Sequence, residues 1–448
     1  MKVFGSSGVR GVANRELTPR RALAVAAAAG TVFEAPRVAV ARDTRTSGEM
    51  LAAAVASGLA SAGADVADLG VAPTPALQAH CERAGVPGAM VTASHNPPEY
   101  NGIKLVGADG VELTRDRLEQ VEAAMAGEAA RASWETLGGI ETVEGAADDY
   151  VTEVLGALDR DAIADADLTV ALDPGHGAAS GTTPRLFREL GCTVLTVNAQ
   201  PDGRFPGRNP EPVASNLADL QRLVRTSDAD LGVAHDGDGD RAIFVDETGD
   251  VVEGDAALAA LAAAELEPGD AAVTAVNASQ RLVDVANAAG ADLHLTPIGS
   301  TYLITEIRRL QADGAGVPIA GEGNGGIIFP GYRIARDGAY TAGRFCELVA
   351  EEPASEVVAD FDGYHNVRRN LSYADEEERR AMLSAIERAA TVANADLDTT
   401  DGYRLDYGDG WVLARPSGTE PVIRVYAEAR NRERATKLAE RFTGAIRS

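Results

Sequence analysis

Two polar loops of the sequence carry the side chains best suited to chemistry, and the first surrounds Ser94. It follows a strand that is expected to end at Ala93, it includes His95, and prolines at 97 and 98 keep it from becoming helix. A serine presented in this way can be a nucleophile or a phosphoryl carrier, although a structural turn has the same composition. A hydrolase triad is not expected, because adjacent Ser and His side chains seldom meet and no GxSxG elbow is present.

The second loop holds three aspartates at alternating positions, Asp236, Asp238 and Asp240, followed by Arg241. Apolar runs on both sides place it at a strand-to-strand turn, where the carboxylates would repel one another unless a cation joined them. Hard oxygen ligands indicate Mg²⁺ or Ca²⁺, and an EF-hand fails because Arg241 stands where that loop requires glycine. Mg²⁺ with an outside phosphate oxygen fits best, and a solvated acidic turn is the alternative.

Two further segments could bind a sugar and a phosphate. Glu322 and Asn324 lie in a glycine-rich stretch and could hydrogen-bond to sugar hydroxyls. A guanidinium, two hydroxyls and turn N–H groups, which suit a phosphate dianion, come together near position 417. They belong to Arg415, Ser417, Gly418 and Thr419. Either segment alone could be a structural turn, but all four loops together describe phosphoryl transfer on a sugar phosphate.

The charge balance limits the classes of partner that the protein can bind. With 41 basic and 68 acidic residues the net charge is −27, which argues against nucleic acid or an anionic membrane as a partner. Positions 2, 104 and 437 hold the three lysines, against 38 arginines, so Lys104 is a candidate functional residue. An acid-rich chain with so little lysine has a halophilic composition, in which acidic surface keeps the protein soluble in salty cytosol.

Compartment follows from the cysteines and the N-terminus. The three cysteines, at 81, 192 and 346, form no CxxC pair and predict buried thiols in a reducing cytosol. The chain begins without an apolar signal region, and its alanine-rich run at 22–29 is too short to span a bilayer. We therefore expect a soluble, cytoplasmic protein.

The loops need elements to position them, and Val- and Ile-rich runs alternate with amphipathic stretches, which is typical of α/β domains with mostly parallel sheets. A strand at 38–40, a polar loop at 42–47 and a helix at about 51–59 make one unit. The runs 168–172 and 272–276 begin similar units, so a threefold repeat is expected. Beyond about residue 364, a helix, a strand hairpin and a helix predict an α+β domain.

This pattern predicts three similar α/β mixed-sheet domains and a smaller C-terminal α+β domain around a central cleft. The expected boundaries give each domain one loop. Residues 1–145 carry the serine loop, 146–247 the metal loop, 248–355 the sugar-recognition loop and 356–448 the phosphate-binding loop.

Five motifs in order resemble those of the α-D-phosphohexomutase family, which contains phosphoglucomutases, phosphomannomutases and phosphoglucosamine mutases. They are FGSSGVRG from Phe4, TASHNP from Thr92, DGDGDR from Asp236, GEGNGG from Gly321 and RPSGTEP from Arg415. The resemblance covers essentially the whole chain. It implies the four domains and a phosphohexomutase activity.

The resemblance also implies residue roles. Ser94 would carry the phosphoryl group, and Mg²⁺ would be bound by a phosphoserine oxygen with Asp236, Asp238 and Asp240. The reacting centre would be lined by Arg10, His95 and Arg241. Lys104 falls where a proton-transferring group is expected, and nearby arginines would lower its pKa. Glu322 and Asn324 would read the sugar hydroxyls, and the set from Arg415 to Thr419 would hold the non-reacting phosphate.

The implied reaction interconverts hexose or hexosamine 6-phosphates and 1-phosphates through phosphoserine and a 1,6-bisphosphate that also activates the enzyme. Glucosamine 6-phosphate is the first expectation, because the pattern most resembles archaeal phosphoglucosamine mutases. Glucose and mannose phosphates are the alternatives, and a Mg²⁺-dependent sugar-phosphate phosphatase is a rival class. Sugar phosphates are the expected partners, and a homodimer is the expected assembly.

The acidic composition generates a stability prediction. We expect the thermal unfolding midpoint to rise when KCl increases from low to molar concentration, because salt screens the repulsion among surface carboxylates. Calorimetry across a KCl series measures it. A midpoint that is already maximal without salt would refute the halophilic reading.

Overall fold

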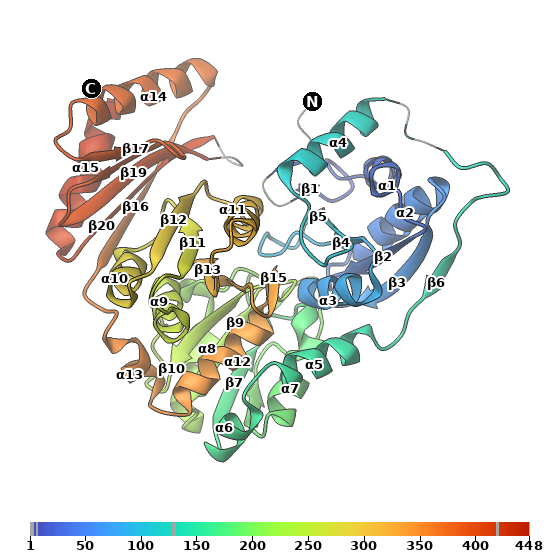
Figure 1. Ribbon diagram of the computed structural model, residues 1–448, viewed down its shortest axis with the longest axis horizontal. Coiled ribbons are helices and arrows are strands. Elements are labelled where there is room, and N and C mark those ends of the chain that lie inside the picture. Colours follow the sequence, from blue (N-terminus) through green and yellow to red (C-terminus); the bar gives the residue numbers. More distant parts are fainter. Residues whose placement is uncertain (1–3, 6–7, 128, 130, 418–420, 448) are drawn as a thin grey trace. The chain divides into compact units, whose positions relative to one another are not determined.

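The computed structural model describes residues 4–5, 8–127, 129, 131–417 and 421–447 (Figure 1). The chain forms two compact units, one of residues 1–257 with 324–359 and one of residues 258–323 with 360–448. The first unit carries the serine loop and the acidic loop. The second carries Glu322 and the segment around Arg415.

The first sheet presents the serine loop at the carboxyl end of a central strand. Its strand order is β1 (Val9–Val12), β5 (Tyr100–Val106), β4 (Gly88–Val91), β2 (Arg37–Arg42), β3 (Asp65–Val71) and β6 (Ile140–Thr142). The strands β4, β2, β3 and β6 are parallel, and β5 is antiparallel to β4 and β1. Because β2 and β4 are parallel neighbours, the loops that follow them meet at one edge of the sheet.

Helices cover both faces of this sheet because its strands alternate their side chains. Val38 and Val40 of β2 join the core formed with α1, α2 and α4, while Ala39 and Ala41 point to the opposite face, where α3 packs. The helices are α1 (Pro19–Phe33), α2 (Gly48–Ser61), α3 (Thr74–Ala84) and α4 (Arg115–Ala126). The strand predicted at 38–40 and the helix predicted at about 51–59 are thereby confirmed.

The second sheet presents the acidic loop in the same way. Its order is β10 (Ala242–Asp246), β9 (Leu231–His235), β7 (Thr169–Asp173) and β8 (Thr193–Thr196). Only the pair β9–β10 is antiparallel, and the turn between these strands holds the aspartates. The accompanying helices are α5 (Ala146–Gly156), α6 (Arg160–Asp165), α7 (Thr183–Glu189) and α8 (Ala218–Ser227), with 3₁₀ turns at Ala178–Gly181 and Ala214–Asn216.

A later stretch of the chain completes the core of this second sheet. Leu220 and Val224 of α8 pack on one face. On β10, Phe244 stacks on Phe345 with ring centroids 4.1 Å apart. Phe345 belongs to α12, so residues 324–359 fold with the acidic loop. The elements of this stretch are β14 (Gly326–Phe329), β15 (Arg333–Arg336), α12 (Gly338–Val349) and α13 (Ala354–Ala359).

The second unit begins within α9 (Gly254–Glu265) and holds three parallel strands, with β11 (Ala271–Ala275) between β12 (Asp292–Thr296) and β13 (Ile319–Glu322). Its other helices before the C-terminal sheet are α10 (Gln280–Ala289) and α11 (Ser300–Ala312). Glu322 is the last residue of β13. Directly before it, Gly321 pairs with Thr274 of β11.

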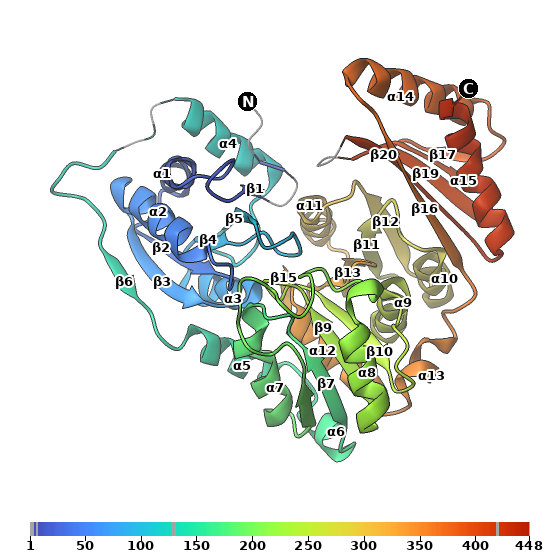
Figure 2. The same cartoon turned by 180° about the vertical axis from the view of Figure 1, so that it is seen from behind.

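The C-terminal sheet is fully antiparallel (Figure 2). Its strands in order are β16 (His365–Ser372), β20 (Val422–Ala429), β19 (Gly410–Pro416), β18 (Tyr403–Asp406) and β17 (Asp396–Asp398). Its two helices, α14 (Glu376–Thr391) and α15 (Arg432–Arg447), share one core with this sheet. On the other face, Trp411 and Tyr426 pack against Val276 of the same unit.

The expected fold class is confirmed, with mixed α/β sheets in three domains and an antiparallel sheet in the C-terminal one. The predicted order of helix, hairpin and helix in the tail was wrong, because it omitted β16, β17 and β18. Most residues of β16 are exposed or half-buried, and its sequence HNVRRNLS does not alternate, so only its eight-residue pairing with β20 makes it a strand. No helix among the described residues is both long and apolar enough to cross a bilayer.

The contact between α1 and α2 generates a stability prediction. A Cβ added at Gly58 would lie 2.5 Å from the carbonyl oxygen of Leu23 and 2.8 Å from Cβ of Ala26. We expect Gly58→Ala to cost about 1–3 kcal/mol of unfolding free energy through overpacking, seen as a lower first transition in calorimetry. Gly156→Ala is the control, because its Cβ would enter open space. Equal midpoints for the two variants would contradict this packing.

Candidate active site

Ser94 is held in an unusual backbone conformation at the edge of the first sheet. Its φ is +54°, in the left-handed region that residues other than glycine rarely adopt. The Ser94 amide donates to Oγ1 of Thr92 at 2.8 Å, and the side chain is almost fully buried. A strained conformation held by hydrogen bonds fixes the direction of the serine hydroxyl.

The three aspartates of the acidic loop converge at one point. All three are buried, and one oxygen from each lies within 4.8 Å of the others. The Oδ1 atoms of Asp238 and Asp240 have no hydrogen-bond partner among the described residues. Buried carboxylate oxygens without donors are costly. This donor set therefore fits a hard divalent cation such as Mg²⁺, which binds carboxylate oxygens.

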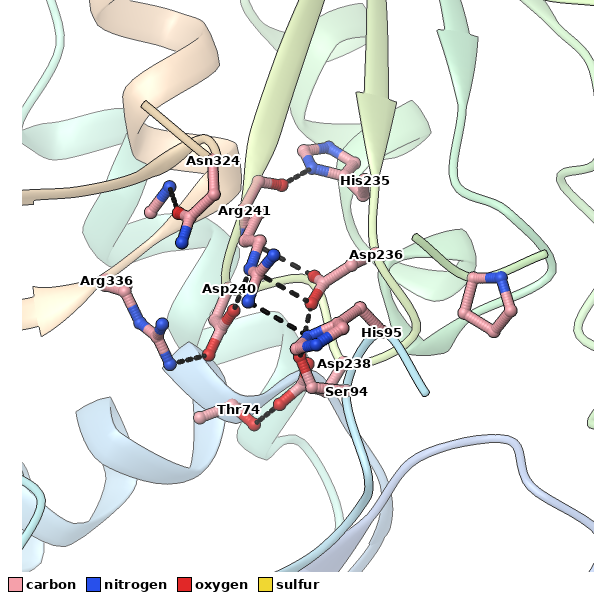
Figure 3. Close-up of polar contacts among 12 residues, drawn as sticks. Thr74, Ser94, His95, His235, Asp236, Asp238, Asp240, Arg241, Asn324 and Arg336 are labelled. Atoms are coloured by element: carbon pink, nitrogen blue, oxygen red, sulfur yellow. Dashed lines mark hydrogen bonds and ion pairs between the residues drawn. The ribbon is translucent and has the colours of Figure 1, made fainter. Parts of the chain in front are cut away.

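The serine and the acidic loop meet directly (Figure 3). Oγ of Ser94 donates to Oδ2 of Asp236 at 2.6 Å. Burial and then the charges of Asp238 and Asp240 raise the pKa of Asp236 above its ordinary value. Three adjacent carboxylates thus cannot all ionise easily by themselves, and a cation would restore the third charge. A phosphoryl group on Ser94 would begin at the same place.

Cationic side chains surround the aspartates. The Lys104 ammonium donates to Oδ2 of Asp238 and of Asp240, both at 2.8 Å. Arg336 of β15 donates to the Asp240 carboxylate at 2.7 Å, and Nε of Arg241 lies 3.9 Å from oxygens of Asp236 and Asp240. Two strands of the first unit, β5 and β15, and the acidic loop's own Arg241 therefore bring positive charge to the aspartates.

The pKa prediction for Lys104 was wrong in direction. Burial would lower the pKa of its ammonium, but the carboxylates of Asp238 and Asp240 raise it above the ordinary lysine value. The sequence pattern considered only nearby arginines as neighbours. In the structure Lys104 lies in β5 with its ammonium between two aspartates, so it is protonated at neutral pH.

His95 pairs with an arginine rather than with the serine. The Arg241 guanidinium, followed by burial, lowers the pKa of His95 well below its ordinary value. The ring is therefore neutral, and Nδ1 accepts from Nη2 of Arg241 at 2.9 Å. Its distance of 3.4 Å to Oγ of Ser94 is long for an O–H···N bond. His95 is thus bonded to Arg241 and is not placed to act as a general base toward the Ser94 hydroxyl.

The acidic loop is closed at its base by a second histidine. Burial lowers the pKa of His235 to about 4, so this ring is also neutral. Its Nδ1 lies 2.7 Å from the carbonyl oxygen of Arg241, which accepts from it (Figure 3). This bond ties the last residue of β9 to the residue that precedes β10.

The other residues selected from the sequence are divided between the two units, with Arg10 and Asn324 in the first and Glu322, Arg415 and Ser417 in the second. Arg10 of β1 donates to Oδ1 of Asn96 at 2.6 Å, beside the serine. The Asn324 side chain is exposed and accepts from the amide of Gly326 at 3.0 Å. In the second unit, Nε of Arg415 lies 2.9 Å from Asp401. Glu322 and Ser417 also belong to that unit, while Gly418 and Thr419 lie outside the described residues.

Sequence reasoning missed two contacts of the acidic loop. Thr74, at the start of α3, donates its hydroxyl to Oδ2 of Asp238 at 2.6 Å. The other is Arg336, the last residue of β15, which lies 96 residues after Asp240 in the sequence. Neither stands in a polar motif of its own. The Thr74-Pro75 pair signals a helix start, which could have been recognised, but nothing local pointed to its partner.

Family models match all four parts of the chain. They describe phosphoglucomutase/phosphomannomutase α/β/α domain I at residues 1–132, domain II at 148–249, domain III at 253–364 and the C-terminal domain at 370–445. The boundaries predicted at 145, 247 and 355 stay predictions, because the compact units divide the chain differently.

Individual relatives agree over nearly the full length. A phosphoglucomutase/phosphomannomutase of Thermococcus kodakarensis is 42% identical, over 98% of this chain and 97% of the relative. A probable phosphoglucosamine mutase of Methanopyrus kandleri is 40% identical, over 100% and 98%. A solved phosphoglucomutase/phosphomannomutase family protein from Burkholderia thailandensis superposes with a TM-score of 0.85 at 28% identity, over 99% and 97%.

The donor set of the acidic loop generates a metal-binding prediction. At constant ionic strength we expect Mg²⁺ to raise the unfolding midpoint, because a ligand at a hundred times its Kd stabilises by about 2.7 kcal/mol. Asp238→Asn should lose this increment even if the variant itself is more stable without metal. Asp250→Asn, at an exposed turn, should keep it. An increment that survives in Asp238→Asn would exclude the proposed ligands.

Proposed function

The chain belongs to the phosphoglucomutase/phosphomannomutase family of α-D-phosphohexomutases, and on this premise we propose that it moves a phosphoryl group between O6 and O1 of a hexose or hexosamine phosphate. The observation that carries the proposal is the serine hydroxyl 2.6 Å from a buried cluster of three carboxylates ringed by cations.

The reaction consists of two transfers that use Ser94 in opposite directions. In the first, the phosphorus–oxygen bond to Ser94 breaks, a bond to the free sugar hydroxyl oxygen forms, and the proton lost by that hydroxyl is balanced by the proton that Oγ of Ser94 takes up. The product is a 1,6-bisphosphate bound to unphosphorylated enzyme. In the second, the other phosphate returns to Ser94 and its sugar oxygen takes a proton. The net change is a moved phosphate, so no other reactant is consumed.

Charge control supports this chemistry. We propose that Asp236, Asp238, Asp240 and a phosphoserine oxygen hold Mg²⁺, whose charge would stabilise the transferring oxygens. The arginines Arg241 and Arg10 would add fixed donors beside the serine. Lys104, protonated between two aspartates, is suited to donate a proton to a sugar oxygen as that oxygen is released. Neutral His95 would keep the Arg241 guanidinium in place.

Substrate reading belongs to the segments of the second unit and to Asn324. Glu322 ends a buried strand and offers an acceptor to sugar hydroxyls. Arg415 is fixed by Asp401, and the Ser417 amide donates to the carbonyl of Val422 at 2.8 Å. These bonds shape the start of the turn that would hold the non-reacting phosphate. Gly418 and Thr419 complete this proposed set.

The sugar itself is the finer part of the proposal. We propose glucosamine 6-phosphate first, from the resemblance of the motifs to archaeal phosphoglucosamine mutases. Glucose and mannose phosphates are the second candidate, favoured by the 42% identity to a phosphoglucomutase/phosphomannomutase against 40% to a probable phosphoglucosamine mutase. A 2-amino and a 2-hydroxyl group differ by one charge, so one side chain near O2 could reverse the preference.

The setting of the reaction is also part of the proposal. A hexose 1,6-bisphosphate would phosphorylate Ser94 and so activate the enzyme. The three cysteines are free and buried thiols, which suits a reducing cytosol. A homodimer of this chain stays a prediction.

The decisive experiment compares kcat/KM for glucosamine, glucose and mannose 6-phosphates, with Mg²⁺ and glucose 1,6-bisphosphate present. We expect conversion of all three with the highest value for glucosamine 6-phosphate. Ser94→Ala should lose at least about a thousandfold in kcat, since the covalent carrier is gone. Release of inorganic phosphate in place of the 1-phosphate would reveal a phosphatase, and full activity of Ser94→Ala would remove the phosphoserine from the mechanism.

A further inference from the structure

A buried acid–guanidinium pair lies beneath the serine loop. Asp43 follows β2, and its Oδ2 accepts from Nε of Arg45 at 3.0 Å. The two side chains are fully buried. Oδ2 also accepts from the Thr92 hydroxyl at 2.6 Å, and that hydroxyl accepts from the Ser94 amide. A chain of three hydrogen bonds therefore runs from Arg45 to the backbone of Ser94.

The rest of the Arg45 guanidinium holds the loop carbonyls. Its two terminal nitrogens donate to four backbone oxygens at 2.6–2.9 Å. These oxygens belong to Ser94, Asn96, Pro97 and Tyr100. An arginine has five donors in a fixed planar fork, and here all its nitrogens are used. No other common side chain could make these contacts together.

An equivalent pair lies beneath the acidic loop. Asp173 is the last residue of β7, and its Oδ2 accepts from Nε of Arg208 at 2.8 Å. Nη2 of the same arginine donates to the carbonyl of His235 at 2.6 Å, directly before Asp236. Its Nη1 donates to the carbonyls of Asn209 and Pro210. This pair is also buried.

The two pairs occupy the same place in related sheets. In the first sheet Asp43 follows the strand parallel to β4, which leads to Ser94. In the second, Asp173 ends the strand parallel to β9, which leads to Asp236. In the third, Thr274 of β11 donates its hydroxyl to the carbonyl of Gly321, directly before Glu322. Each repeat therefore binds the backbone that leads into a functional residue from the neighbouring strand.

Energetics argue that these pairs are not there for stability alone. Removing two charges from water costs several kcal/mol per ion, and apolar residues of similar volume often stabilise as well or better. Both guanidiniums donate to backbone carbonyls in loops and at the ends of strands. The loop of Arg45 also meets the segment that precedes Arg208, because the Phe205 ring centroid lies 5.2 Å from the Arg45 guanidinium and Gly203 packs against Thr44.

We propose that Arg45 and Arg208 are positioning residues with separate tasks. Arg45, with Asp43 and Thr92, holds the backbone of Ser94 in the left-handed conformation from which the phosphoryl group is transferred. Arg208, with Asp173, holds the approach to the acidic loop so that its carboxylates converge on a cation. The proposal rests on the proposed function for its kinetic readout, and its loop readouts are independent of it.

The test compares Arg45→Lys, Thr92→Val and Arg208→Lys in the full chain. Transfer from glucose 1,6-bisphosphate to Ser94 is followed by intact mass, and Mn²⁺ binding to the metal-free protein by paramagnetic resonance. We expect Arg45→Lys and Thr92→Val to slow the phosphorylation of Ser94 and to leave the Mn²⁺ affinity unchanged. For Arg45→Lys the rate should fall by about a hundredfold, which is the effect of a small misplacement of the reacting group. Arg208→Lys should weaken Mn²⁺ about tenfold, within the range for loss of a supporting contact.

Amide hydrogen exchange supplies the direct readout of position. We expect faster exchange confined to residues 94–106 in Arg45→Lys and to residues 234–242 in Arg208→Lys. Arg333→Lys is the matched control, since Arg333 is buried and pairs with Glu82 and Glu153, away from both loops. It should lower the unfolding midpoint while leaving phosphorylation and Mn²⁺ binding as in the wild type.

The outcomes separate the possibilities. Equal losses of phosphorylation and Mn²⁺ affinity in both arginine variants would mean a merely structural role and overturn the proposal, as would wild-type values in both. If Arg45→Lys does not fold, Thr92→Val decides whether the Ser94 loop is positioned as proposed, because this substitution keeps the side-chain volume and removes one hydroxyl. If the wild type accepts no phosphoryl group from the bisphosphate, the proposed function fails, while exchange and Mn²⁺ binding still decide the positioning roles.

Discussion

Mutual repulsion among three buried carboxylates is the constraint on which the first unit depends. Asp236, Asp238 and Asp240 lie within 4.8 Å of one another in a nearly water-free interior. At such distances each like-charge pair costs several kcal/mol, even at the moderate effective dielectric of a protein. The surrounding fold therefore has to deliver positive charge and hydrogen-bond donors to one turn of six residues between β9 and β10.

The donors come from segments far apart in the sequence. Lys104 arrives from β5, Thr74 from the start of α3 and Arg336 from β15. Because these elements lie far apart in the sequence, tertiary packing fixes where the charges lie. The chain as a whole has a net charge of −27, but here Lys104, Arg241 and Arg336 set three positive charges against the three carboxylates. A guanidinium or ammonium next to an aspartate also keeps its proton, so the positive charges around the loop persist through moderate changes of pH.

The parts of this arrangement that are local could be predicted from the sequence. The Ser94 loop and the acidic loop are polar segments that end apolar strands, and parallel strands bring such ends to one edge. Lys104 was conspicuous because the chain has so few lysines. The contacts of Thr74 and Arg336 could not be predicted, because they join positions 164 and 96 residues apart and neither lies in a recognisable motif. The strand β16 could not be predicted for the same reason, because its pairing with β20 and not its own sequence pattern makes it extended.

The stacking of Phe345 on Phe244 has a consequence for the synthesis of the chain. The strands that flank the acidic loop are complete once residue 246 has been made, but the helix covering one face of them comes about a hundred residues later. At typical translation rates this delay is roughly 5–20 s. During that interval the second sheet exposes an apolar face and the aspartates remain open to water. The reacting centre therefore matures only after α12 has been made, although Ser94, Lys104 and the three aspartates lie in the first 240 residues.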